Sequence, residues 1–171
     1  KYYMEKYRLS TFVEVNFHLY KHNIGDDLKK MQSLCNELGF LLSTTYANVT
    51  PVERLINYRE GKIDDEAKKI LDLLIVDIDK GLDITREYRN EPCRFLSNQI
   101  NINWDRSVPI CCVSFDAEGT IISQDYLKDS IKTINNKKNN HPFCNKCMKY
   151  GFPPYMLGLN KKEWEKAAEN K

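Results

Sequence analysis

The first part of the chain alternates between strand-like and helix-like patterns. In residues 11–20, apolar side chains occupy every second position, which predicts a strand with one apolar face. Residues 26–38 space their apolar side chains as on one face of a helix, and Gly39 stands where helices commonly end. A short β-rich run follows at 40–46. Because the joints are short, we expect a βαβ unit with parallel strands and a right-handed crossover.

The pattern becomes mainly helical after this unit. Pro51 interrupts the β pattern, and a short helix is expected to follow it. Residues 64–88 place apolar side chains three and four positions apart, which predicts one longer helix that ends or bends at Gly81. Beyond these residues the helical pattern gives way to a β-rich alternation, so we expect a domain boundary near Asn90.

The second half of the chain mixes short elements of both kinds. Residues 91–123 alternate in the manner of strands, with turn residues at WDRS and DAEG, and predict a hairpin. A short helix is expected within 126–140, a compact knuckle at 141–156 and a final helix at 159–171. Together the patterns predict the α/β class, with a βαβ unit in the first part and a small α+β second part.

Composition narrows the class of protein. The chain has 171 residues, of which 42% are hydrophobic, which is enough for a core. A net charge of +2 gives no strong signal for nucleic-acid binding. No apolar run approaches the length of a membrane span, so no membrane partner is expected. Residues 1–10 lack the apolar core of a signal peptide, which predicts a cytoplasmic location, where thiols stay reduced.

The six cysteines are unevenly placed, with five of them in the second half of the chain. In a reducing compartment this number indicates a metal site more than a disulfide framework. Cys144 and Cys147 form a CxxC pair, which can bind one metal ion or one cluster. Cys93 and the adjacent Cys111 and Cys112 precede that pair. A hairpin between the first two positions and a helix before the CxxC would bring four thiolates together.

Four thiolates suit either tetrahedral zinc or an iron–sulfur cluster. Zinc sites made of cysteine usually contain two CxxC knuckles, and this chain has one, which favours a cluster. A zinc-stabilised binding domain without catalysis is the first alternative, and a metal-free interaction module with core cysteines is the second. Cys35 lies on the apolar stripe of its predicted helix and is expected in the core. Trp104 and Phe143 flank the other cysteines and would shield a cluster from water.

Three stretches of the second half form an ordered set of motifs. They are CRFLSNQININWDRSVPICC (93–112), YLKDSIKTI (126–134) and HPFCNKC (141–147). They supply a cysteine, a turn with Trp and Asp, a cysteine pair, a short helix and a closing CxxC. This order resembles the C-terminal auxiliary-cluster region of radical S-adenosylmethionine (SAM) enzymes, the SPASM and twitch class. No cysteine follows the CxxC, so the resemblance is to the shorter twitch form.

The match departs from the family pattern at two positions. Arg106 stands where the turn of the family usually has glycine, and Pro109 lies one place early. The resemblance therefore rests on the order and spacing of the cysteines more than on the turn between them.

The resemblance implies one auxiliary [4Fe–4S] cluster. Its expected ligands are Cys93, Cys111, Cys144 and Cys147, with Cys112 as a substitute for Cys111. In this class such a cluster would relay an electron or support the structure during radical-based modification of a substrate. The identity of that substrate is not implied.

The first 90 residues resemble the later βα units of the partial (β/α) barrel of the same family. The implied domains are residues 1–90, as the C-terminal part of a radical SAM barrel, and residues 91–171, as the auxiliary-cluster domain. Asn16 and His18, on the polar face of the first predicted strand, would then lie on the side of S-adenosylmethionine or the substrate.

One defining motif of the family is absent. CxxxCxxC, which holds the catalytic cluster and leaves an iron open for S-adenosylmethionine, does not occur in this sequence. The implied partner is therefore an N-terminal radical SAM half, on the same polypeptide or on another chain. Without that half, the chain is not expected to cleave S-adenosylmethionine.

Overall fold

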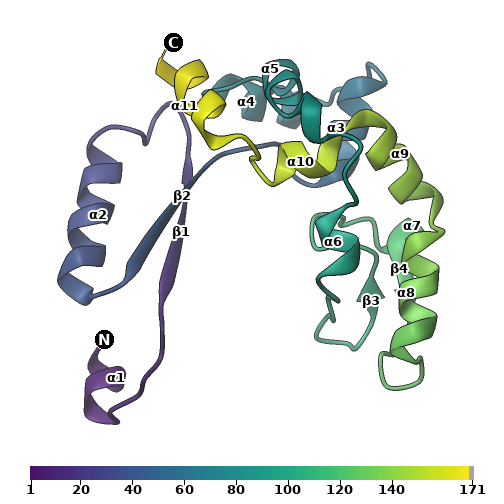
Figure 1. The fold of residues 1–171 in the computed structure, drawn as a ribbon, viewed down its shortest axis with the longest axis horizontal. Helices are drawn as coiled ribbons and strands as arrows, with labels where there is room; N and C mark the ends of the chain where they lie inside the picture. Colours follow the sequence, from purple (N-terminus) through teal and green to yellow (C-terminus); the bar gives the residue numbers. More distant parts are fainter. Residues whose placement is uncertain (170–171) are drawn as a thin grey trace.

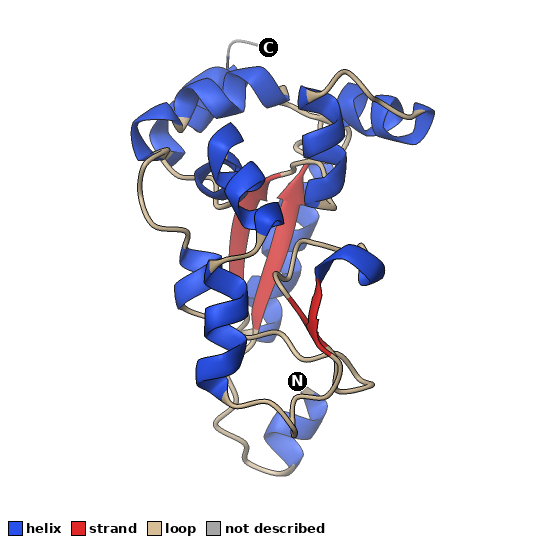
Figure 2. Ribbon diagram, turned by 90° about the vertical axis from the view of Figure 1, so that its right-hand side faces the viewer, coloured by secondary structure: helices blue, strands red, loops and turns tan. Residues whose placement is uncertain are grey.

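Helices dominate the structure, and the strands form two separate two-stranded sheets (Figure 2). The computed structural model describes residues 1–169, without the side chains of Ser97, Ala117 and Glu118. The elements in chain order are α1 (Tyr2–Lys6), β1 (Glu14–Leu19), α2 (Asp26–Leu38), β2 (Leu41–Tyr46), α3 (Val52–Arg59), α4 (Asp65–Leu73), α5 (Ile78–Ile84), η1 (Arg86–Tyr88), α6 (Arg94–Ser97), β3 (Val108–Pro109), α7 (Ala117–Thr120), β4 (Ile121–Ser123), α8 (Ile131–Asn139), α9 (Pro142–Tyr150), α10 (Phe152–Met156) and α11 (Lys161–Glu169). The predicted mixture of helices and strands is confirmed.

The βαβ unit is present as predicted. β1 and β2 pair in parallel along their whole length, and α2 lies beside them (Figure 1). Gly39 ends α2 in the left-handed conformation, with φ 69° and ψ 34°, which glycine adopts without a steric penalty. Cys35, on the inner face of α2, is 1% exposed and belongs to the core as expected.

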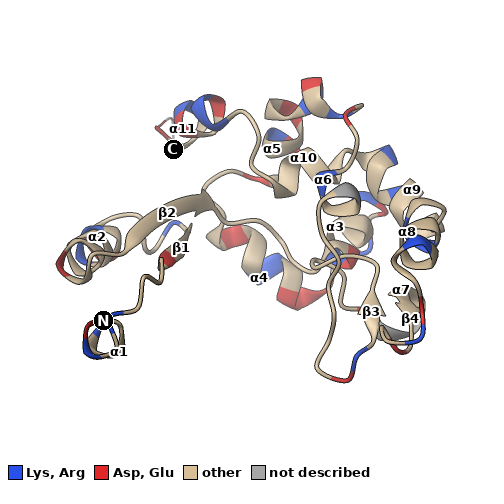
Figure 3. Ribbon diagram, turned by 60° about the horizontal axis from the view of Figure 1, so that its bottom comes forward, with Lys and Arg blue, Asp and Glu red and all other residues tan. Residues whose placement is uncertain are grey.

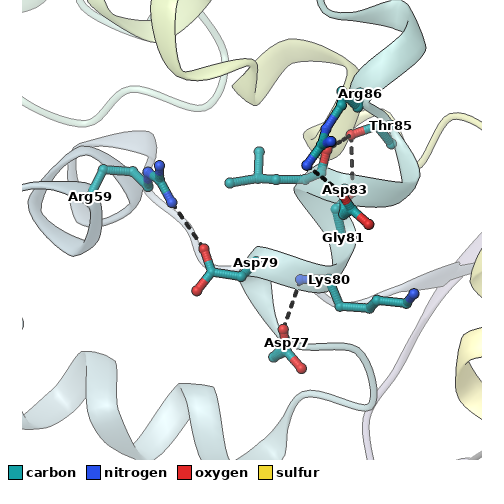
Figure 4. A network of polar contacts seen from close by, with 9 residues as sticks. Arg59, Asp77, Asp79, Lys80, Gly81, Asp83, Thr85 and Arg86 are labelled. Carbon is teal, nitrogen blue, oxygen red and sulfur yellow. Dashed lines mark hydrogen bonds and ion pairs between the residues drawn. The ribbon is translucent and has the colours of Figure 1, made fainter.

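The long helix predicted over 64–88 is broken in the middle. Residues 74–77 separate α4 from α5, and Leu74 has an extended backbone. Leu74, Ile75 and Val76, in this connection between the two helices, are all buried. The Asp77 carboxylate then accepts a hydrogen bond from the backbone N–H of Lys80 and starts a new helix (Figure 4).

Gly81 lies inside α5 and does not end or bend a helix there, contrary to the prediction. Its carbonyl accepts a hydrogen bond of 3.0 Å from the Thr85 hydroxyl, one turn later (Figure 4). A Cβ atom at this position would lie 2.6 Å from ring atoms of Trp164 and of Tyr155. Glycine therefore lets α5 approach the helices that carry these rings, a requirement that the local sequence does not reveal.

The hairpin of the second half lies within the predicted range 91–123, but it is shorter than predicted. β3 pairs with β4 in antiparallel fashion, with Val108 opposite Ser123. Cys111 and Cys112 therefore lie in the connection between these strands, and not at the end of a hairpin that begins near Cys93. The segment after Cys93 forms the short helix α6 in place of the expected strand.

The CxxC pair lies on a helix, where the sequence suggested a compact turn. α9 begins at Pro142, and the His141 side chain caps it by accepting a hydrogen bond of 3.3 Å from the backbone N–H of Phe143. Gly151 ends the helix in the left-handed conformation. This capping gives His141 a structural role at the start of α9.

The main core is shared between the two parts of the chain. It includes Leu55 and Ile78 from before the expected domain boundary, and Phe152, Tyr155 and Trp164 from after it. A smaller core forms around the β3–β4 pair from Val108, Ile110, Ile122 and Ile134. The boundary near Asn90 stays a prediction, but the packing joins its two sides.

The close approach at Gly81 makes a direct test of the packing. We expect Gly81→Ala to lower the free energy of unfolding by about 1–3 kcal/mol, because the added methyl group overpacks the contact with two rings. Urea denaturation measures the change. The control is Lys80→Ala, at an exposed position of the same helix, which should stay within about 0.5 kcal/mol of the parent. Equal stability of the two variants would contradict the prediction.

Candidate metal centre

Four cysteines from three separate segments line one hollow. Cys93 precedes α6, Cys111 lies between β3 and β4, and Cys144 and Cys147 stand one turn apart on α9. All four border the same hollow. In Figure 1, α6, β3, β4 and α9 gather at the end of the molecule opposite β1 and α2. The structure thus brings together the four thiols that the sequence singled out.

The rest of the lining is apolar. It consists of Val52, Phe95, Leu96, Val113, Phe143, Met148, Pro153 and Met156. Phe143 borders the hollow, as expected, whereas Trp104 does not line it and is 97% exposed. Trp104 was placed near the site because it is close to Cys111 in sequence, but its turn points toward solvent. An apolar lining excludes water and strengthens any electrostatic interaction inside.

Three of the thiols in this hollow have raised pKa values. Burial raises the pKa of Cys111 to about 12 and that of Cys144 to about 11. Burial also raises the pKa of Cys147, and the nearby Cys93, Cys111 and Cys144 raise it further. A metal or cluster binds thiolates, so its binding here has to displace protons.

The two adjacent cysteines differ in orientation. Cys111 lines the hollow, whereas Cys112 is exposed and does not line it. The Cys112 sulfur accepts a hydrogen bond of 3.0 Å from Nε2 of Gln99. Of the two alternatives that the sequence left open, the geometry favours Cys111 as the ligand.

The spacing of the sulfurs bears on what the hollow can hold. Within residues 1–169, no three His, Cys, Asp or Glu side chains are placed so that they could bind one metal ion. The four thiols nevertheless share one hollow. Four thiols suit a cluster or a zinc ion by their chemistry. The choice between these two occupants stays a prediction.

A carboxylate on α3 fixes the segment that carries Cys111. Glu53 Oε1 accepts hydrogen bonds from the backbone N–H groups of Phe115, at 3.0 Å, and Asp116, at 3.1 Å. It also accepts one from the hydroxyl of Ser114. The backbone N–H of Val52 donates to the carbonyl of Val113, at 2.8 Å. The start of α3 thus holds the chain just after the cysteine pair.

Sequence reasoning missed Glu53. Its partners lie more than 60 positions away along the chain. An acidic residue in the first turn of a helix is so common that it carries no signal of a distant partner. An alignment showing that Glu53 varies together with residues 114–116 would have been the signal to look for.

Asn16 and His18 lie apart from the cysteine hollow. Both are exposed on β1, on the face opposite Val15 and Phe17, as the alternation predicted. Neither side chain lines the hollow with the cysteines. Their placement on the side of S-adenosylmethionine or the substrate stays a prediction.

Comparisons with family models, with curated proteins and with solved structures find no match to this chain. No helix among the described residues combines the length and the apolar character that crossing a bilayer requires. The interpretation of the site therefore depends on its residues, their geometry and the resemblance in the order of motifs.

The raised thiol pKa values make the stability of the metal-free chain depend on pH. An unfolded thiol has a pKa near 9.0, below the folded values for Cys111 and Cys144. Above that pH the unfolded chain releases thiol protons that the folded chain keeps, which favours unfolding. The stability that the neutral thiols give the folded chain is therefore fully present below about pH 9 and is lost as the pH rises. Urea denaturation from about pH 8 to about pH 10.5 should show the fall, and Cys144→Ala should flatten it. An unchanged slope in that variant would count against buried thiols.

Proposed function

We propose that this chain is the cluster-binding C-terminal part of a radical SAM enzyme. Cys93, Cys111, Cys144 and Cys147 would hold one auxiliary [4Fe–4S] cluster. The observation that carries the proposal is that these four cysteines, from three segments, line one apolar hollow. The exposed neighbour Cys112 and the core residue Cys35 do not line this hollow. Only the four cysteines of the expected ligand set, out of six in the chain, therefore border it.

The turn before the cysteine pair supports the resemblance. Arg106 occupies the position where the family usually has glycine, and it adopts a φ of 71°. Positive φ is the conformation that glycine adopts most readily. The Asp105 carboxylate accepts hydrogen bonds from the Ser107 N–H, at 2.9 Å, and hydroxyl, at 2.7 Å. The chain thus makes a glycine-type turn with arginine, so the substitution at Arg106 is compatible with the pattern of the family.

The residues of the hollow define what the site could do. When bound, a cluster of this kind accepts and passes on single electrons, or it holds its domain together. Ligation by four cysteines would leave no iron open to a substrate, which favours electron transfer or structural support. The apolar side chains exclude water from the sulfurs, and α9 sets two of the four thiols one helical turn apart.

The parallel pair β1–β2 supports a place for this chain within a larger sheet. Among the described residues, no third strand joins this pair. Parallel sheets usually have more strands and are covered on both faces. Here Asn16 and His18 are exposed on β1, and Leu41 is 55% exposed on β2. We infer that an N-terminal radical SAM half completes a partial (β/α) barrel around these strands.

Radical formation would belong to the complete enzyme. Reductive cleavage of S-adenosylmethionine needs the CxxxCxxC cluster, which this sequence lacks. The completed barrel would bring S-adenosylmethionine or the substrate to the open face of β1, where Asn16 and His18 stand. The auxiliary cluster would then serve the radical-based modification of a substrate whose identity is open.

Anaerobic reconstitution with iron and sulfide tests the proposal. We expect about four iron and four sulfide per chain and a brown protein with broad visible absorption. Cys111→Ala should lose most of the iron, whereas the adjacent Cys112→Ala should keep it, because only Cys111 lines the hollow. Metal analysis and absorption spectra measure both.

Two results would overturn the cluster assignment. A colourless protein that takes up about one zinc per chain and refuses iron would establish the zinc-stabilised binding domain. Stability that does not respond to chelators, with no metal bound under any condition, would establish the metal-free interaction module.

A further inference from the structure

A buried lysine lies beside the cysteine hollow. Lys138, on α8, is 1% exposed, and no other charged residue described in residues 1–169 is buried to this degree. Burying a charge costs several kcal/mol unless the protein compensates for it, so such a lysine calls for partners.

Three backbone carbonyls receive the ammonium group. Lys138 Nζ donates hydrogen bonds to the carbonyl oxygens of Phe95 at 3.2 Å, Leu96 at 3.0 Å and Gln99 at 2.5 Å. These three bonds use all of its donors. They also tie α8 to the chain just after Cys93, because Phe95 and Leu96 belong to α6. The lysine therefore holds one cysteine-bearing segment in place.

Among the described residues, no carboxylate forms an ion pair with Lys138. The hydrogen-bond partners of Lys138 are all backbone carbonyls. α8 and α9 contain lysines and neither Asp nor Glu, and Figure 3 shows only basic residues coloured on these two helices. The hydrogen bonds satisfy the donors, but the positive charge itself lacks an anionic partner among these groups.

The sulfurs of the adjoining hollow are candidates for that partner, because Phe95 and Leu96 border the hollow and also bind Lys138. Burial lowers the pKa of Lys138, and the charges of Cys111, Cys144, Cys93 and Cys112 oppose the shift. Four thiolates around a [4Fe–4S] core would make the site negatively charged in both of its common oxidation states, and more so after reduction.

We propose that Lys138 is a positioning residue and the positive charge partner of the cluster site, and that its charge favours the reduced cluster. This inference rests on the proposed function of the cysteines. The reduction on which Lys138 would act adds one electron to the cluster from an external low-potential donor. It forms and breaks no bond and transfers no proton.

Redox titration of the reconstituted protein with dithionite tests the inference. Lys138→Gln removes the charge but keeps two donors for the carbonyls, so we expect it to fold and bind iron. At a fixed solution potential, its ratio of reduced to oxidised cluster should fall about tenfold, which is about 59 mV for one electron. Lys138→Arg keeps the charge and should stay near the parent value.

The matched control is the neighbouring lysine. Lys137→Gln changes an equal charge on the same helix, but Lys137 is half-exposed and pairs with Asp129 at 3.1 Å. Its titration curve should coincide with that of the parent, because solvent screens the charge.

Each outcome decides between the two proposals. If the parent protein binds no cluster, the proposed function fails. If it binds a cluster and Lys138→Gln titrates like the parent, the role of Lys138 is refuted while the cluster stands. If Lys138→Gln and Lys138→Arg shift the potential equally, the charge is not the cause and the inference is equally refuted.

Discussion

The candidate site depends on one constraint, which is that three distant segments must surround a hollow lined by four thiols, of which Cys147 is buried and the other three are half-buried. Cys93, Cys111 and the CxxC of α9 belong to different elements, and no local turn joins them. Burial in the apolar lining raises the pKa values of Cys111, Cys144 and Cys147, which favours their neutral form without a metal. Folding around the hollow therefore does not require these three thiols to be buried as unpaired thiolates.

Two side chains of opposite charge hold these segments by binding backbone. Glu53 accepts hydrogen bonds from backbone N–H groups in the connection after Cys111. Lys138 donates hydrogen bonds to backbone carbonyls in and just after α6, which follows Cys93. Each group satisfies polar atoms that the short irregular elements around the hollow leave without partners in a helix or sheet. The site is thus built less from secondary structure than from these two long-range anchors.

Local pattern predicted the elements whose partners are close in sequence. The helix 26–38, its end at Gly39 and the parallel pairing of its flanking strands follow from spacing alone and are confirmed. The helix over 64–88 and the exposed Trp104 were mispredicted because distant packing decides them. The cysteines were found because a motif marks them. Glu53 and Lys138 were missed because a lone acid or lysine on a helix gives no sign of what lies across the fold.

The proposed function has two parts, cluster binding and chemistry with S-adenosylmethionine, and this chain contains the residues for the first part only. The four cysteines of the proposed cluster site and the side chains that hold their segments all lie within the described residues. The parallel pair β1–β2, by contrast, has no neighbouring strand within residues 1–169 and leaves Asn16 and His18 exposed. Sheets of this kind gain stability from further strands and covering helices. The proposed cluster binding can therefore be tested on this chain, whereas the proposed chemistry with S-adenosylmethionine requires the further strands of the proposed barrel.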